Sequence, residues 1–135
     1  MNNKLMQLAT ERLKKVNYQE YQNCVDLTKG RLHDINLIPL IFQEVIRTYP
    51  ANPENTPFIL GVIYYLYAPY KLHFTDLRLQ NGMRQIIISL MNWNDAPTVN
   101  YYADRLVAYY KNPRFAARVH AISDEIYEAL KEFDS

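Results

Sequence analysis

The stretch TPFILGVIYYLYAP, at positions 56–69, is the most informative part of the sequence for the fold. A threonine followed by a proline is typical of a helix start, because proline fits the first helical turn. Phe58–Ala68 is apolar on every side, which is the pattern of a helix enclosed by other elements. It has about half the length that a membrane-spanning helix needs, and Pro69 ends it. The segment therefore predicts a buried helix at about 57–67, at the centre of the domain.

The residues on both sides of this segment carry helical patterns. The isoleucine triplet at 86–88 would suit a strand, but no second segment alternates apolar and polar residues to pair with it. The sequence therefore predicts an all-α fold, with one domain over 1–135 and a compact bundle of five or six helices around the central one. The flanking helices are expected at Asn3–Val16, from Asn17 to near Gly30, from Asp34 or Asn36 to Tyr49, at Met83–Met91, from Pro97 to about Lys111, and from Asn112-Pro113 to about Phe133.

Apolar residues recur at three- and four-residue steps in the first, second and last of these flanking helices. This spacing places them on one helix face, which we expect to point inward. Asn17 and Glu20 have the spacing of a capping box at the start of the second helix. The three stripes are Leu5, Leu8, Ala9, Leu13 and Val16, then Tyr21, Cys24, Val25 and Leu27, then Phe115, Val119, Ile122, Ile126, Ala129 and Phe133.

The net charge of +1 conceals an uneven distribution along the 135 residues. Residues 71–120 hold seven basic and three acidic side chains, a net of +4, and residues 121–135 hold one basic and five acidic side chains, a net of −4. A basic stretch can attract nucleic acid. A basic helix packed beside an acidic helix explains the same distribution. A continuous basic face would favour nucleic acid, and its members would be Arg84, Arg105, Lys111, Arg114 and Arg118.

No group of residues has the spacing of a catalytic, metal or cofactor site. Cys24 is the only cysteine, so an internal disulfide and a multi-cysteine metal site are excluded, and we expect a structural role for it. The three glycines are isolated, which excludes a phosphate-binding loop. The histidines His33, His73 and His120 lie in separate segments without a second ligand at metal-site spacing. We therefore expect a protein that is not an enzyme and that binds no cofactor and no metal.

No segment has the apolar core of a signal peptide or the length of a membrane span. We therefore expect a cytoplasmic protein that does not bind membranes.

The twelve tyrosines are the most unusual feature of the composition. Eight of them fall in two groups, at 64–70 and at 101–110. Tyrosine has an apolar ring and a polar hydroxyl, so it suits the edges of a small core and binding surfaces alike. Since the sequence contains no recognisable set of catalytic residues, the enrichment in tyrosine favours a non-catalytic interaction module. Such a module works through protein contacts, with a protein partner or as a homodimer.

An alternative function rests on residues 82–111, where two expected helices are joined by a short turn as in a helix-turn-helix. Asp95, Pro97, Thr98 and Val99 fall where a known DNA-binding domain has the signature Asp-His-Thr/Ser-Thr-Val. That domain is the Trp-repressor-like C-terminal domain of the bacterial replication initiator DnaA.

Residues 82–130 resemble this domain, and the helix that begins at Asn112 falls where the family has its last helix. Ala96 or Pro97 stands where the family has the signature histidine. The resemblance implies that the hairpin at 82–111 binds DNA, with contacts from Thr98, Asn100 and Arg105.

Helical periodicity separates two faces over residues 99–111. On the outward face, Arg105 and Lys111 would meet phosphates and Asn100 would reach a base edge, whereas the charge of Asp104 opposes DNA binding. Tyr101 is the first candidate for a protein contact, because it also faces outward. The inward set is Val99, Tyr102, Ala103, Leu106 and Tyr110, and the outward set is Asn100, Tyr101, Asp104, Arg105, Ala108 and Lys111.

Overall fold

The computed structural model describes residues 3–20, 22, 29–75, 78–94 and 96–134. In this part of the chain there are helices and 3-10 turns but no strand, which confirms the all-α class, and the triplet at 86–88 is helical. No helix formed by the described residues has both the length and the apolar character needed to cross a bilayer. The elements are α1 (Asn3–Val16), η1 (Ile35–Leu37), α3 (Ile38–Ile46), α4 (Thr56–Tyr67), η2 (Pro69–Leu72), α5 (Met83–Met91), α6 (Ala96–Tyr110), α7 (Pro113–Leu130) and η3 (Lys131–Phe133).

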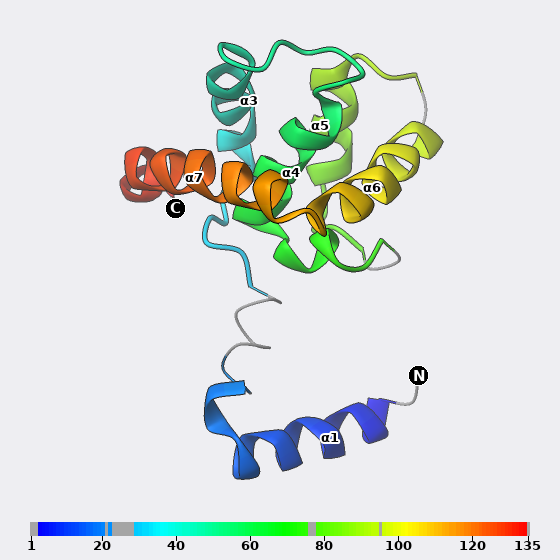
Figure 1. Cartoon of the computed structure of the whole chain (residues 1–135), viewed down its shortest axis with the longest axis vertical. Coiled ribbons are helices and arrows are strands. Elements are labelled where there is room, and N and C mark those ends of the chain that lie inside the picture. Colours follow the sequence, from blue (N-terminus) through cyan, green and yellow to red (C-terminus); the bar gives the residue numbers. More distant parts are fainter. Residues whose placement is uncertain (1–2, 21, 23–28, 76–77, 95, 135) are drawn as a thin grey trace.

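Helix α4 is the centre of the bundle, as its sequence predicts. All of its residues are buried except Tyr65, which is half-buried. It packs against α3, α6, α7 and η2, and it lies behind α7 in Figure 1. The helix ends at Tyr67 with Ala68 as its C-cap, directly before Pro69, where an end was expected.

The start of α4 differs from the prediction by one residue. Thr56 is already the first helical residue, and its hydroxyl donates to the carbonyl oxygen of Asn52 at 2.7 Å. The reason is that the preceding turn runs directly into the helix, so the N–H of Thr56 also donates to Asn52 O, at 3.0 Å. Pro57 lies in the first helical turn, as expected.

A glycine in α4 allows two other helices to approach closely. A Cβ atom at Gly61 would lie 3.2 Å from both Leu106 Cδ1 of α6 and Val119 Cγ2 of α7. Such a distance is shorter than ordinary van der Waals contact, so a larger residue would push α6 or α7 outward.

Helix α3 is shorter than predicted. It ends at Ile46 and not at Tyr49, because the N–H groups of Thr48 and Tyr49 both donate to the carbonyl of Val45 and form a turn. At its other end, Asp34 accepts a hydrogen bond from Asn36 N–H at 3.0 Å and caps η1, which leads into α3.

Helix α7 begins as predicted and departs from the prediction toward its end. The side chain of Asn112 caps it by accepting from Arg114 N–H at 2.9 Å. Val119 and Ile126 are buried as expected, but Ala129 and Phe133 are exposed, so their predicted burial is wrong. Figure 1 shows the reason, since the last turns of α7 extend past α4.

Helix α1 does not join the core, and its predicted inward stripe is wrong for the described side chains. Leu8 is 68% exposed and Val16 is 60% exposed, while Leu13 is half-buried. The helix stands apart from the bundle in Figure 1, which leaves its apolar face open. Asn17 caps the next helical stretch, as predicted, by accepting from Glu20 N–H at 3.1 Å. The predicted inward stripe that includes Cys24 lies outside the described residues.

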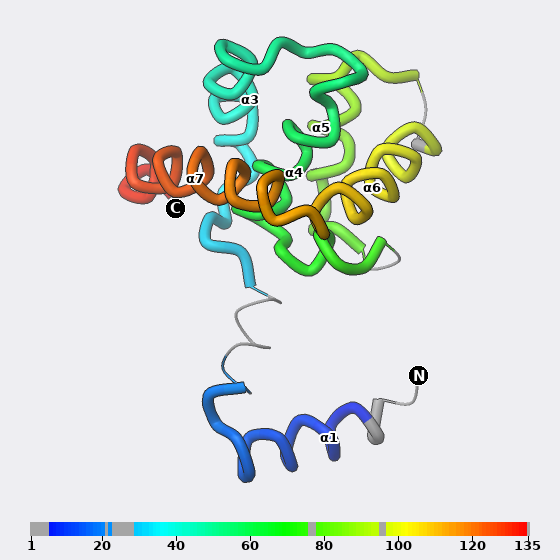
Figure 2. The backbone as a smooth tube through the Cα atoms, in the orientation of Figure 1, coloured from blue at the N-terminus to red at the C-terminus, as the bar shows by residue number. Residues whose placement is uncertain are grey.

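The chain enters the core along the end of α4 (Figure 2). The N–H of Leu32 donates to the carbonyl of Leu66 at 3.0 Å, and Leu32 is buried. A Cβ atom at Gly30 would lie 2.3 Å from the carbonyl oxygen of Tyr67, so only glycine fits at this approach of two backbone segments.

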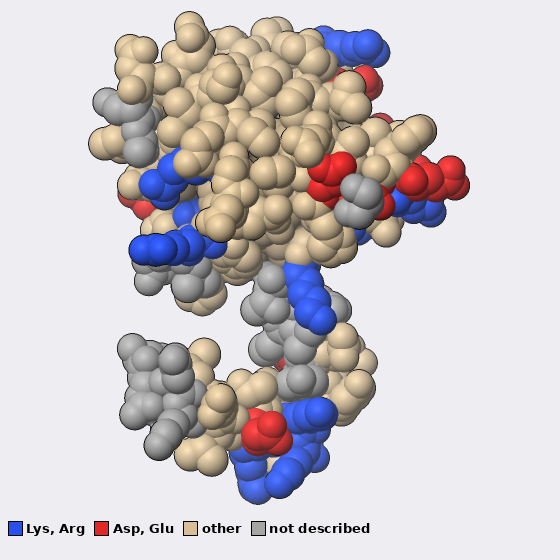
Figure 3. All heavy atoms as spheres, turned by 180° about the vertical axis from the view of Figure 1, so that it is seen from behind, with Lys and Arg blue, Asp and Glu red and all other residues tan. Residues whose placement is uncertain are grey.

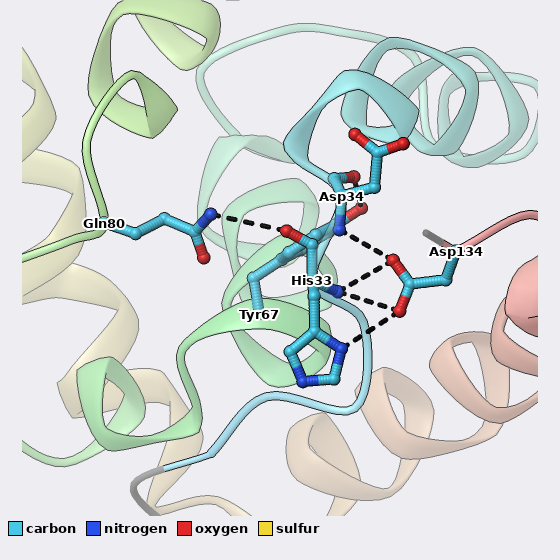
Figure 4. A network of polar contacts seen from close by, with 5 residues as sticks. All are labelled: His33, Asp34, Tyr67, Gln80 and Asp134. Atoms are coloured by element: carbon cyan, nitrogen blue, oxygen red, sulfur yellow. Dashed lines mark hydrogen bonds and ion pairs between the residues drawn. The ribbon is translucent and has the colours of Figure 1, made fainter.

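Asp134 fastens this entry segment to the residues that follow α7 (Figure 4). Its carboxylate accepts hydrogen bonds from the backbone N–H of Asp34 at 2.7 Å and from that of His33 at 3.0 Å, and it lies 3.1 Å from His33 Nδ1. The Tyr67 hydroxyl donates to Asp34 O at 2.8 Å from the opposite side. Residues about a hundred positions apart in sequence are thus joined by one side chain.

Candidate functional site

The candidate site is built on α6, which carries Thr98, Asn100, Tyr101 and Arg105, and Lys111 directly follows this helix. Asn92 ends α5 in a left-handed conformation, with φ 58°, and the chain then turns into α6. Asp95, the first residue of the signature that resembles the DNA-binding domain, lies outside the described residues.

The two predicted faces of α6 are confirmed. Val99, Ala103 and Leu106 are buried, and Tyr102 and Tyr110 are half-buried against the core. Thr98 is half-buried at the edge of the outward face. The outward residues are all exposed, namely Asn100, Tyr101, Asp104, Arg105, Ala108 and Lys111.

Arg105 lies between two tyrosines on this outward face. Its Nη1 donates to the Tyr101 hydroxyl at 3.3 Å, and its Nη2 donates to the Tyr109 hydroxyl at 2.9 Å. Its guanidinium carbon is 5.5 Å from the Tyr101 ring centre and 5.7 Å from that of Tyr109, which is the range of a cation–π contact. The spacing of four residues on each side puts all three side chains on one line along the helix. The hydrogen bond to Tyr109 is the largest contribution that raises the pKa of Arg105.

Two hollows adjoin this line of side chains, and they share Glu54 and Tyr109 in their walls. The smaller hollow has a volume of about 280 Å³ and is lined by Pro53, Glu54, Pro57, Tyr101, Tyr102, Arg105 and Tyr109. The larger has a volume of about 410 Å³ and is lined by Tyr49, Glu54, Asn55, Phe58, Tyr109, Asn112, Arg114, Phe115 and Arg118.

Together these residues form a surface that we call the tyrosine–arginine face, defined as Tyr101, Arg105, Tyr109, Arg114 and Arg118. Within the part of the chain that the structure describes, no carboxylate lies at ion-pair distance from any of its three arginines. The face therefore presents positive charge beside aromatic rings. Arg118 also places its guanidinium 5.7 Å from the ring centre of Phe58.

The structure brings together only some of the residues that sequence reasoning selected. Tyr101 and Arg105 belong to the tyrosine–arginine face, whereas Thr98, Asn100 and Lys111 line neither hollow. Sequence reasoning missed Tyr109 as a member of the site. The repeat Tyr101, Arg105, Tyr109 at steps of four is the signal that could have identified it.

A second cluster joins histidines that are far apart in sequence. The Tyr110 hydroxyl lies 2.5 Å from His120 Nε2, and the His120 ring stacks on Tyr65 with 4.5 Å between ring centres. The ring of His73 meets Tyr110 edge-on at 5.6 Å. Burial raises the pKa of Tyr110. These contacts link α4, α6, α7 and His73, which directly follows η2, and they are packing contacts between these elements.

Among the described residues, no three histidine, cysteine, aspartate or glutamate side chains are grouped so that they could hold a metal ion. Comparison with models of known protein families, with curated proteins and with solved structures finds no match to this chain. The resemblance of residues 82–130 to the DNA-binding domain of DnaA therefore stays a prediction.

Proposed function

We propose that this protein is a non-catalytic interaction module that binds a protein partner through the tyrosine–arginine face. The observation that carries the proposal is the exposed Arg105, which lines the smaller hollow and is held between Tyr101 and Tyr109, and Tyr109 lines both hollows. Tyrosine and arginine are the residue types most enriched at the energetic centres of protein interfaces. An arginine whose position is already set by hydrogen bonds loses less conformational entropy when a partner binds.

The charge of the face supports a partner surface that carries acidic side chains. Arg105 uses two of its N–H donors on tyrosine hydroxyls, which leaves others for an incoming carboxylate. Arg114 and Arg118 add two further cations on α7, and Glu54 is the acidic residue in the walls of both hollows. Apolar partner side chains would enter the hollows, whose walls include the half-buried Phe115 and the exposed Tyr101 and Tyr109.

Quantitative affinity purification from the native source, with matched variants as bait, tests this proposal. Tyr101→Ala and Arg105→Ala are expected to reduce recovery of a bound protein by about thirtyfold, which corresponds to a loss of about 2 kcal/mol at an interface centre. Gln85→Ala is the control, because Gln85 is exposed on α5 and lines neither hollow of the face. Recovery of the same proteins at the same level by all three variants would contradict the proposal.

A DNA-binding function through the α5–α6 hairpin is the second candidate. The outward position of Asn100, Arg105 and Lys111 favours it. Asp104 is exposed on the same helix and would repel phosphates, and Arg105 already donates to two tyrosines. Titration of a duplex at several salt concentrations separates the two functions. DNA binding predicts an affinity that falls steeply with salt and a smaller salt slope for Arg105→Ala, whereas a protein-binding module predicts no salt-sensitive binding to any duplex.

A further inference from the structure

Helix α1 has an apolar face that nothing in the described part of the chain covers fully. Met6, Leu8 and Val16 are exposed, and Leu13 is half-buried. A helix of 14 residues is marginally stable in water on its own, and most helices depend on the burial of one apolar face. The exposed stripe of α1 is therefore suited to a contact with another surface.

The core presents a groove between α3 and α7 that is suited to such a helix. Its volume is about 380 Å³, and its walls are mainly apolar. Leu40 at its edge is 58% exposed, Ala129 is exposed, and Ile122 and Leu130 are half-buried. Amphipathic helices bind in apolar grooves of this kind by inserting side chains spaced three and four residues apart.

The charges on the two surfaces are complementary. Figure 3 shows the basic side chains gathered on α1, and the described ones are Arg12, Lys14 and Lys15, against one acidic residue, Glu11. The groove has Glu44 and Glu125 in its walls. Glu44 pairs with Arg47 at 3.3 Å, whereas Glu125 has no ion-pair partner among the described residues. Glu125 is thus available to the basic last turn of a docked α1.

We propose that α1 of a second copy of this chain lies in the groove between α3 and α7, and that two copies exchange α1 in a reciprocal dimer. In the chain itself α1 stands apart from the bundle (Figures 1 and 3). Exchange of an identical element covers both apolar surfaces in both copies and produces a closed, two-fold symmetric assembly. This contact involves other residues than the tyrosine–arginine face, so it leaves that face open to a different partner.

Complementation between two defective variants of the full chain tests the exchange. Leu8→Asp places a charge in the apolar stripe of α1, and the double substitution of Leu40→Lys with Ala129→Lys places charges at the edges of the groove. Leu8, Leu40 and Ala129 are exposed, so neither variant disturbs the core. Lysine at 129 also lies four residues after Glu125, which is a favourable helical pair. Gln7→Asp is the control, because Gln7 lies on the opposite face of α1.

Analytical ultracentrifugation over a wide concentration range gives the readout. The wild type and Gln7→Asp are expected to dimerise, and each defective variant to weaken the dimer on the order of tenfold or more. An equimolar mixture of the two defective variants is expected to form a heterodimer, because one helix and one groove remain intact in it. Glu125→Lys, at an exposed position, is expected to weaken the dimer by itself, and restoration by Lys14→Glu with Lys15→Glu would identify the basic last turn as its partner.

Three outcomes would overturn the exchange. A wild-type monomer at every concentration shows that α1 contacts no second copy or folds back on the groove of its own chain. Dimerisation of Leu8→Asp with wild-type strength shows that the stripe is not the contact. Failure of the mixture to form a heterodimer, while each variant alone is monomeric and folded by circular dichroism, shows that α1 of one copy does not occupy the groove of the other.

Discussion

Replacement of Asp134 by asparagine is the change that tests most directly how the entry segment is held. The carboxylate accepts two backbone hydrogen bonds, from Asp34 N–H at 2.7 Å and His33 N–H at 3.0 Å, and its side chain is only 10% exposed. Asparagine keeps the shape of the side chain and one acceptor oxygen. The second carboxylate oxygen is replaced by an NH2 group, which is a hydrogen-bond donor and faces a backbone N–H.

The expected loss follows from the number and setting of these bonds. A hydrogen bond to a charged group contributes about 1.5–3 kcal/mol to the free energy of unfolding. Both N–H groups also donate to the same oxygen, Oδ1, so the asparagine oxygen can accept from both, but without the negative charge that strengthens these bonds. We expect a decrease in the free energy of unfolding of about 1–2 kcal/mol, and a melting temperature lower by roughly 3–8 °C.

The decrease in the free energy of unfolding caused by Asp134→Asn should depend on pH in a defined direction. Burial raises the pKa of Asp134, but the hydrogen bonds from Asp34 and His33 together lower it below its ordinary value of 3.8. A carboxyl group with a lowered pKa in the folded state contributes stability that is complete above its pKa in the unfolded state. That stability is lost as the pH falls through the folded value. The wild type should therefore lose its advantage over Asp134→Asn below about pH 4.

Urea and thermal unfolding, followed by circular dichroism between about pH 3 and pH 7, measure both quantities. Glu132→Gln is the matched control, since it removes the same charge from an exposed position nearby. A variant as stable as the wild type at neutral pH would refute the reasoning. A loss that stays constant to the lowest pH would show that packing, and not the charged carboxylate, holds the segment.

Further changes test the core by the same unfolding measurements. Leu66→Ala should cost about 2–5 kcal/mol, because Leu66 is fully buried in α4, and a smaller loss would argue against that burial. Tyr64→Phe should leave the free energy of unfolding unchanged or raise it by about 1 kcal/mol, because the buried Tyr64 hydroxyl has no hydrogen-bond partner among the described residues. Tyr67→Phe should lower it by about 1 kcal/mol, because that hydroxyl donates to Asp34 O, and equal effects of the two tyrosine changes would contradict the assignment. Gly30→Ala should destabilise by more than about 2 kcal/mol, since a Cβ there meets a backbone carbonyl that cannot move aside, and a neutral result would refute this close approach.

Local sequence signals were sufficient for the central helix and for the two faces of α6. The residues of α4 are apolar on every side, so the helix is suited only to a position enclosed by other elements. Pro69 follows soon after its end at Tyr67. Along α6 the helical period of 3.6 residues places Tyr101 and Arg105 on one face and Ala103 and Leu106 on the other. This assignment does not depend on which elements pack against the helix. The clustering of Arg105 with Arg114 and Arg118 did not follow from the sequence, because it depends on where α7 begins relative to α6.

The sequence by itself determined that the chain is helical, which residues form apolar faces, and that α4 is enclosed. These properties depend on neighbours within a few residues, through helical periodicity and the backbone limits of proline. Only the tertiary structure decided which apolar faces are covered. Leu8 in α1 and Phe133 after α7 are exposed although their spacing equals that of buried positions, because burial requires a second surface. It also decided that Asp134 meets His33 and that His120 meets Tyr110, since contacts between different helices depend on how the helices pack.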